Sequence, residues 1–159
     1  MALTAFVLIT WFVIFFFILL PKKLSLVENS FVFLSMSIII INTFTVVGFN
    51  FKWITSNNEP QFYLAYLLYR TIIYPFALLV LVNIFYMSNQ FILKIVATLS
   101  VISFIFLTEI LGAKLNVYFY KKWNNWYSIT EIVLFSILAL VVTKFILYMR
   151  QRKQSHANL

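Results

Sequence analysis

Five long apolar runs fill most of this 159-residue chain and limit what it can fold into. A helix needs about 20 apolar residues to cross a bilayer, and each run has about that length. Hydrophobic residues make up 64% of the chain and charged residues 10%, whereas soluble domains have roughly 45–50% and about 25%. Burial in a soluble core does not explain this composition. The chain is therefore predicted to be an all-α, polytopic transmembrane bundle.

Short polar segments separate the runs, so residues 1–159 are expected to form a single transmembrane domain. Pro21 ends the first run, with two lysines after it at the headgroup level. A cluster of turn-forming residues at 56–60 precedes the third run, and a tight turn at 88–90 precedes the fourth. The expected spans are residues 2–20, 30–50, 62–87, 91–111 and 126–149, followed by a basic polar tail at 150–159.

Residues 112–125, between the fourth and fifth spans, are rich in Tyr and Trp and are expected to lie flat in the membrane interface. Trp123, Trp126 and Tyr127 would then belong to an interfacial aromatic belt. The alternative is that they form a lid over polar residues buried in the bundle.

Positive charges at the two ends of the predicted bundle set its expected orientation. An odd number of spans places the termini on opposite sides, and the side with the C-terminal tail has more basic residues close to span ends. We therefore expect a cytoplasmic C-terminus and an external N-terminus. The cations on the tail side are Lys22, Lys23, Lys94, Lys144, Arg150, Arg152 and Lys153, and those opposite are Lys52, Lys114, Lys121 and Lys122.

Apart from Lys94 and Lys144, which are close enough to the tail side to extend their side chains to it, three charged residues fall inside the predicted spans, where each costs about 2.5–3.5 kcal/mol on insertion scales. They are Arg70, Glu109 and Glu131. Spans three and five begin on the side where span four ends, so all three residues lie in the same half of the bilayer. Helical spacing and depth add Asn42, Tyr66 and Tyr74 to this candidate buried polar layer.

Two interpretations of the polar layer stay open. In the structural one, Arg70 pairs with Glu109 or Glu131 and the network fixes the order of the helices. In the functional one, the carboxyl groups and the guanidinium form a site for a proton, an ion or a ligand. A third possibility is that some of these charges face a partner chain.

The composition excludes many kinds of chemistry. The chain has no Cys and no Asp, and its single histidine, His156, lies in the tail. This rules out thiol chemistry, an intramembrane Ser–His pair and an aspartate dyad, and we expect no cofactor and no metal site. Twelve Lys and Arg face only four Glu, and their positions beside the spans indicate anionic headgroups as partners, not nucleic acid.

Spaced residues from the third span onward form a recognisable order. They are Tyr74, Pro75, Asn83, Glu109, Trp123, Trp126, Tyr127 and Ser128. This order resembles that of an uncharacterised family of small five-helix integral membrane proteins of spore-forming Bacillus and Clostridium relatives. The resemblance covers roughly residues 62–150 and implies the same fold and a bacterial plasma or spore membrane, but no activity.

Three functions follow from these features as hypotheses. The first is a non-enzymatic bundle subunit or scaffold that assembles with itself or with other membrane proteins. The second is a transporter, channel component or proton-linked sensor that uses the polar layer. The third is a membrane-embedded lipid enzyme with Glu109 or Glu131 as general acid or base.

Overall fold

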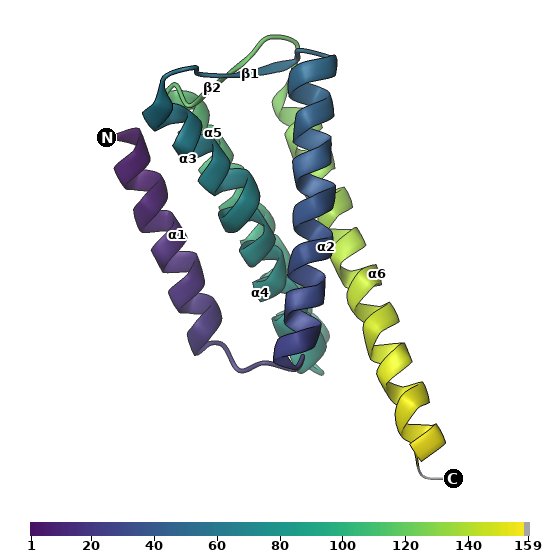
Figure 1. The fold of residues 1–159 in the computed structure, drawn as a ribbon. Helices are drawn as coiled ribbons and strands as arrows, with labels where there is room; N and C mark the ends of the chain where they lie inside the picture. The colour runs from purple at the N-terminus through teal and green to yellow at the C-terminus, as the bar shows by residue number, and fades with distance from the viewer. Residues whose placement is uncertain (158–159) are drawn as a thin grey trace.

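The computed structural model describes residues 1–157, and side chains as far as residue 152. Its long helices run alternately up and down, and two short strands pair at one end of the bundle (Figure 1). This confirms the predicted all-α bundle. The helices are α1 (Ala2–Leu19), α2 (Leu26–Thr45), α3 (Pro60–Leu68), α4 (Tyr74–Met87), α5 (Phe91–Lys114) and α6 (Asn125–Ala157), with π-helical segments η1 (Val46–Asn50) and η2 (Tyr69–Ile73) and strands β1 (Ile54–Ser56) and β2 (Tyr118–Tyr120).

Five continuous helical stretches of the described chain are long and apolar enough to cross a membrane, which indicates a multi-pass membrane protein. They agree with the predicted spans to within a few residues at each end. They are Ala2–Leu19, Leu26–Asn50, Pro60–Met87, Phe91–Lys114 and Asn125–Arg152.

Local chemistry explains where several helices begin. Ser25 and Glu28 form a capping box, in which the Ser25 hydroxyl accepts from the Glu28 amide and the Glu28 carboxylate accepts from the Ser25 amide. These two bonds satisfy backbone donors that the first turn of α2 leaves free. Pro60 opens α3, where a missing N–H costs nothing.

The stretch Pro60–Met87 is the centre of the bundle. Buried residues make up 61% of its most apolar part, compared with 22–28% in the other four stretches. In Figure 1 it lies between α1 and α2, with α5 beside it. The largely exposed faces of the outer helices are apolar, as lipid contact requires.

A buried amide pair ties this central stretch to α2. Asn83 Nδ2 donates to Asn29 Oδ1 at 2.7 Å and to the Leu79 carbonyl oxygen at 2.9 Å. Asn29 Nδ2 donates in turn to the Leu24 and Ser25 carbonyl oxygens, both at 3.0 Å. Hydrogen bonds of this kind hold helices together in a medium without water.

The proline within the central stretch is accommodated by η2, which comes just before it. The Tyr74 amide donates to the Tyr69 carbonyl oxygen, five residues back, and Pro75 lies at the start of α4. A π-helical turn inserts one residue into the helix and changes which residues share a face. Tyr69 and Tyr74 therefore lie on the same side, with ring centroids 5.8 Å apart.

The two-stranded sheet was not predicted, and it changes the expected path of residues 112–125. Strands β1 and β2 are antiparallel, with Thr55 opposite Phe119, and the Lys121 amide donates to the Trp53 carbonyl oxygen at 2.9 Å. Pairing with β1 satisfies backbone groups that a chain lying flat in the interface would leave to water. The sheet thus covers one end of the bundle.

The predicted polar tail continues α6 at the opposite end of the bundle. Arg150 Nε lies 3.2 Å from Glu28 Oε1, which joins the end of α6 to the start of α2. The side chains of Lys153 and His156 lie outside the part of the chain that the structure describes. An exposed ion pair of this kind stabilises the fold by less than about 1 kcal/mol.

Candidate functional site

A cavity of about 460 Å³ lies under the sheet and contains three positively charged side chains, and we call it the cationic cavity. The cations come from three segments that are distant in sequence. None of the described residues that line it carries a carboxylate. The lining residues are Phe44, Gly48, Phe49, Lys52, Ile54, Thr55, Ser56, Asn58, Tyr63, Tyr66, Arg70 and Lys121.

Arg70, on η2, is the innermost of the three cations. Its guanidinium carbon lies 5.0 Å from the centre of the Tyr66 ring, which is a cation–π contact. Its Nε atom is buried and has no hydrogen-bond partner among the described protein groups. A buried donor without an acceptor costs about 1–3 kcal/mol, so the position of Arg70 is not explained by a gain in stability.

The expected pairing of Arg70 with an acid is not formed. Among the described residues, no ion pair joins Arg70 to Glu109 or to Glu131. The physical reason is the change of register at η2. Arg70 lines the cationic cavity, whereas neither Glu109 nor Glu131 lines it, and both carboxyl groups lie close to the buried Tyr69.

The backbone departs from a regular α-helix in several of the segments that line the cationic cavity. Segments η1 and η2 both contribute lining residues, and π-helical turns are frequent at functional sites. Lys52 has φ 54°, a left-handed conformation that few residues other than Gly adopt. Such strain persists only where the surrounding structure fixes it, and here it places a lysine at the mouth of the cavity.

Glu109 is the centre of a separate hydrogen-bond network, which we call the Glu109 network. Its carboxylate oxygen Oε1 accepts from the Tyr120 hydroxyl at 2.8 Å and from Ser128 Oγ at 2.6 Å. Trp123 Nε1 donates to the same Ser128 Oγ at 2.8 Å, and the Tyr118 hydroxyl donates to the Glu109 carbonyl oxygen at 2.6 Å. Glu109 is only 3% exposed. The network therefore fastens β2 and the start of α6 to the end of α5.

Tyr118 and Tyr120 lie outside the membrane-spanning stretches, and their surroundings keep both hydroxyls protonated. Burial raises the pKa of Tyr118 well above its ordinary value of 10.0, and the charges of Tyr120 and Glu109 raise it further. Burial and the neighbouring Glu109 raise the pKa of Tyr120 in the same way. Both side chains therefore remain hydrogen-bond donors across the physiological range.

These raised pKa values predict that the protein loses stability in alkali. A tyrosine with a raised folded pKa contributes stability that is fully present below the unfolded pKa, near 10, and is lost as the pH rises toward the folded pKa. The midpoint of unfolding, followed by tryptophan fluorescence in a denaturing detergent, should fall above about pH 10. Tyr118→Phe should make this fall shallower, and an equally steep fall in the variant would contradict the assignment.

Other members of the predicted polar layer fall into two groups. Tyr74 is 1% exposed, and neither its hydroxyl nor that of Tyr69 has a hydrogen-bond partner among the described residues. The same holds for Glu131 Oε1. Asn42 is different, because it is exposed and donates to the Ile38 carbonyl oxygen of its own helix. The predicted layer is therefore not continuous across four helices.

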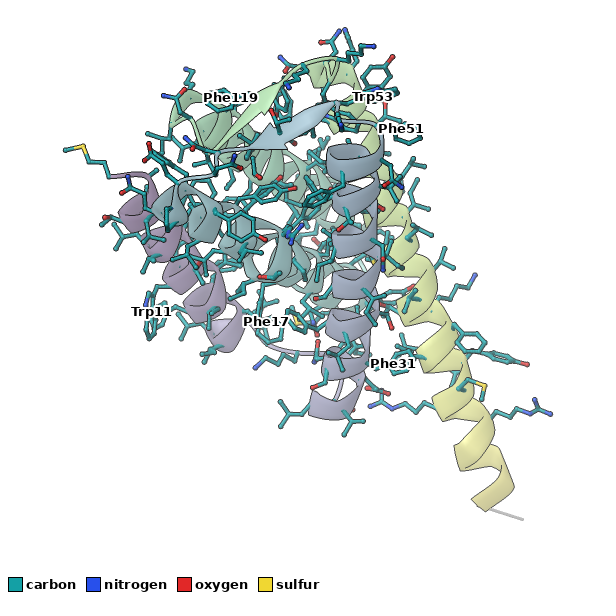
Figure 2. All side chains as sticks on the ribbon, turned by 45° about the horizontal axis from the view of Figure 1, so that its top comes forward. Trp11, Phe17, Phe31, Phe51, Trp53 and Phe119 are labelled. Atoms are coloured by element: carbon teal, nitrogen blue, oxygen red, sulfur yellow. The ribbon has the colours of Figure 1, made fainter. Side chains whose placement is uncertain are left out.

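The predicted aromatic residues gather around one further residue, Trp53. The ring of Trp53 lies 6.2 Å from that of Trp123 and 5.8 Å from that of Tyr127. Trp126 is 74% exposed and belongs to the outer surface. Figure 2 shows Phe51, Trp53 and Phe119 beside the two strands, at the end of the bundle. The aromatic residues thus border the sheet, and their roles as an interfacial belt or as a lid over buried polar residues stay predictions.

Several residues of these sites carried no recognisable pattern in the sequence. Lys52 and Lys121 were expected only as orientation charges, and Tyr69 lies outside the i, i+3, i+4 series that contains Arg70. The strand pairing brings the two lysines together across 69 positions of sequence. Three consecutive aromatic residues at 118–120, a residue type enriched in strands, were the one available indication of a strand.

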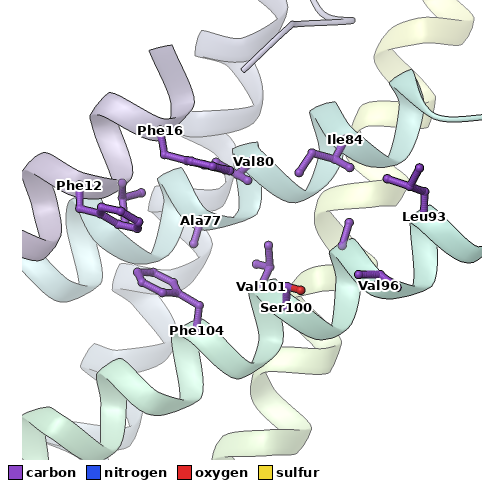
Figure 3. A pocket seen from close by; sticks show the side chains of 12 residues that line it. Phe12, Phe16, Ala77, Val80, Ile84, Leu93, Val96, Ser100, Val101 and Phe104 are labelled. Carbon is purple, nitrogen blue, oxygen red and sulfur yellow. The ribbon is translucent and has the colours of Figure 1, made fainter. Parts of the chain in front are cut away.

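An apolar groove of about 370 Å³ lies elsewhere on the bundle, between α1 and α5 and over α4 (Figure 3). Phe12 and Phe16 approach it from α1, and Phe104 and Val101 from α5. Ser100 is its polar side chain, and none of the described lining residues is charged. The groove offers nothing for polar recognition.

The resemblance to the five-helix family of spore-forming bacteria rests on the sequence alone and stays a prediction. No family model, curated protein or solved structure matches the chain.

Proposed function

We propose that this protein is a non-enzymatic membrane protein that binds an anionic ligand in the cationic cavity. The observation that carries the proposal is the presence of Lys52, Arg70 and Lys121 around one cavity with no carboxylate among its described lining residues. Charges buried at membrane depth are normally paired. Arg70 has no acidic partner among the described residues, its Nε atom has no hydrogen-bond acceptor, and it lines a cavity of ligand size. These features support a ligand that supplies the negative charge.

The three cations differ in what they can contribute. Lys52 and Lys121 are exposed, so they attract an anion to the mouth of the cavity by long-range electrostatics. Arg70 lies deeper, where the lower dielectric strengthens each charged contact. Its planar guanidinium can donate two parallel hydrogen bonds to one phosphate or carboxylate group. We therefore assign capture to the lysines and binding to the arginine.

Neutral donors complete the site. Thr55 and Ser56 of β1 and Asn58 also line the cavity, and each carries a neutral polar side chain. Hydrogen bonds from such groups add specificity for oxygen-rich anions. No nucleophile–base pair is part of this arrangement among the described lining residues, so the proposal is for binding and not for turnover.

The first test is the substitution Arg70→Gln, which removes the charge and keeps most of the side-chain volume. A ligand that binds only the folded state raises its stability, by about 2.7 kcal/mol at one hundred times the Kd. The thermal midpoint of the detergent-solubilised protein is measured against inorganic phosphate, glycerol 3-phosphate and phosphatidic acid. Loss of a charge-assisted contact worth about 1.5–3 kcal/mol should weaken binding by about 10- to 100-fold.

Lys144→Gln is the matched control, because Lys144 is exposed on α6 and does not line the cavity. It should bind each anion as the wild type does. The proposal is wrong if none of the three anions raises the thermal midpoint of the wild type. It is also wrong if Arg70→Gln and Lys144→Gln respond alike.

The broader roles expected from the sequence stay predictions. A transporter or proton-linked sensor would use the cationic cavity as its binding site. The buried polar groups of Tyr69, Tyr74 and Glu131 would then be further parts of its pathway. A scaffold role would require assembly with itself or with another membrane protein. The orientation of the chain and the plasma or spore membrane location are likewise predictions.

A further inference from the structure

We infer that the ligand of the cationic cavity is the phosphate-bearing headgroup of an anionic phospholipid, whose acyl chains stay in the bilayer. This inference rests on the proposed function and names its ligand. The depth of the cavity is the first argument. Lys52 and Lys121 lie between membrane-spanning stretches, while Arg70 is ten residues after Pro60, or about 15 Å along the helix. The cavity therefore extends from the headgroup level into the apolar layer.

The side of the cavity between η1 and α3 faces the lipid. Phe49 on η1 is 68% exposed and Tyr63 on α3 is 40% exposed, and both line the cavity. Both belong to membrane-spanning stretches, where an exposed side chain contacts lipid. A molecule already in the bilayer can therefore enter from the side, with its hydrocarbon against Phe49.

The aqueous side of the cavity is covered by the sheet. Residues Ile54–Ser56 of β1 line the cavity from above. The cover is fastened to the opposite segment by the Lys121 amide, which donates to the Trp53 carbonyl oxygen at 2.9 Å, and by Asn57 Nδ2, which donates to the Asn116 carbonyl oxygen at 3.1 Å. The sheet covers part of the aqueous side, so a soluble anion is left with the mouth beside Lys52 and Lys121, whereas a lipid can also enter from the bilayer.

The lining of the cavity is amphipathic, which matches a lipid better than a free phosphate ion. Its apolar lining residues include Phe44, Phe49 and Ile54. Its polar lining residues include the three cations and the hydroxyl-bearing residues of β1. An arginine fork matches the geometry of phosphate oxygens, and the two lysines add point charges. A volume of about 460 Å³ also lies within the range of small-molecule sites, about 300–1,000 Å³.

The test compares three probes that separate the headgroup from the hydrocarbon. The full-length protein in a mild non-ionic detergent is titrated with dioleoylphosphatidic acid, glycerol 3-phosphate and dioleoylglycerol, and bound probe is measured by native mass spectrometry. We expect phosphatidic acid to bind at least about tenfold more tightly than glycerol 3-phosphate, because only the lipid gains apolar burial. Dioleoylglycerol, which lacks phosphate, should not bind measurably.

Four variants locate the site. Arg70→Gln and Lys121→Gln should each weaken phosphatidic acid binding, and the exposed Lys121 provides this test even if Arg70→Gln fails to fold. Phe49→Ala should weaken binding of the lipid and leave glycerol 3-phosphate binding unchanged. Lys144→Gln, outside the cavity, should bind as the wild type does.

Each contrary outcome has a definite meaning. Glycerol 3-phosphate binding as tightly as phosphatidic acid, or lipid binding unaffected by Phe49→Ala, overturns the lipid inference and leaves the proposed function standing. Failure of every anionic probe overturns both. Equal weakening by Lys144→Gln and Arg70→Gln would show diffuse attraction to a basic surface and would overturn the assignment to this cavity.

Discussion

Replacing Glu109 with Leu is expected to cost several kcal/mol of unfolding free energy. The Tyr120 hydroxyl and Ser128 Oγ both donate to Glu109 Oε1, and leucine offers them no acceptor. Each buried donor left unsatisfied costs about 1–3 kcal/mol. The measurement is the midpoint of unfolding in sodium dodecyl sulfate, followed by tryptophan fluorescence. Because Ser128 also accepts from Trp123, the fluorescence of the folded state should change as well.

Glu109→Gln is the matched variant, because its amide oxygen can accept the same two hydrogen bonds. It should keep most of the stability, and Glu59→Gln, at an exposed position, should keep all of it. A loss in Glu109→Gln as large as that in Glu109→Leu would show that the negative charge, and not the acceptor oxygen, is what the Glu109 network requires.

Adding a single methyl group at Gly112 is expected to have a second large effect. A Cβ atom at this position would lie 2.7 Å from both Cε1 and the hydroxyl oxygen of Tyr118, closer than side chains pack. Tyr118 cannot easily move, because it is 2% exposed and donates to the Glu109 carbonyl oxygen. Overpacking of this kind costs about 1–3 kcal/mol. Gly112→Ala should therefore lower the unfolding midpoint and loosen β2.

Gly48, the other glycine of the chain, supplies the control. A Cβ atom there would lie 3.6 Å from the Ile54 carbonyl oxygen, which is an ordinary contact. Gly48→Ala should be close to neutral, or slightly stabilising because alanine favours helix over glycine by about 1 kcal/mol. If Gly112→Ala were as stable as Gly48→Ala, the close packing of Tyr118 against α5 would be disproved.

The helices were predictable because the membrane imposes a simple rule. Every spanning segment must be apolar and must satisfy its own backbone, so length and hydropathy alone locate it. The predicted third span, 62–87, differs from the observed Pro60–Met87 by two residues. An asparagine inside an apolar span generally hydrogen-bonds to a neighbouring helix, and Asn83 does so with Asn29.

The cavity was less predictable because it depends on features that helical periodicity does not contain. A helical wheel assumes 3.6 residues per turn, which correctly places Tyr66 beside Arg70, but η2 breaks that count and brings Tyr69 and Tyr74 to the same side. The meeting of Lys52 with Lys121 depends on the pairing of two three-residue strands. Strands so short leave almost no periodic trace in a sequence.

The sheet joins two connections that are distant in the sequence. Strand β1 belongs to the connection that follows α2, and β2 to the connection that precedes α6. A change in the tilt of α5 and α6 relative to the other helices would therefore move the sheet that covers Arg70. Ligand binding in the cationic cavity and the spacing of the helices are therefore expected to be coupled. A molecule bound under the strands would then influence how closely the helices pack.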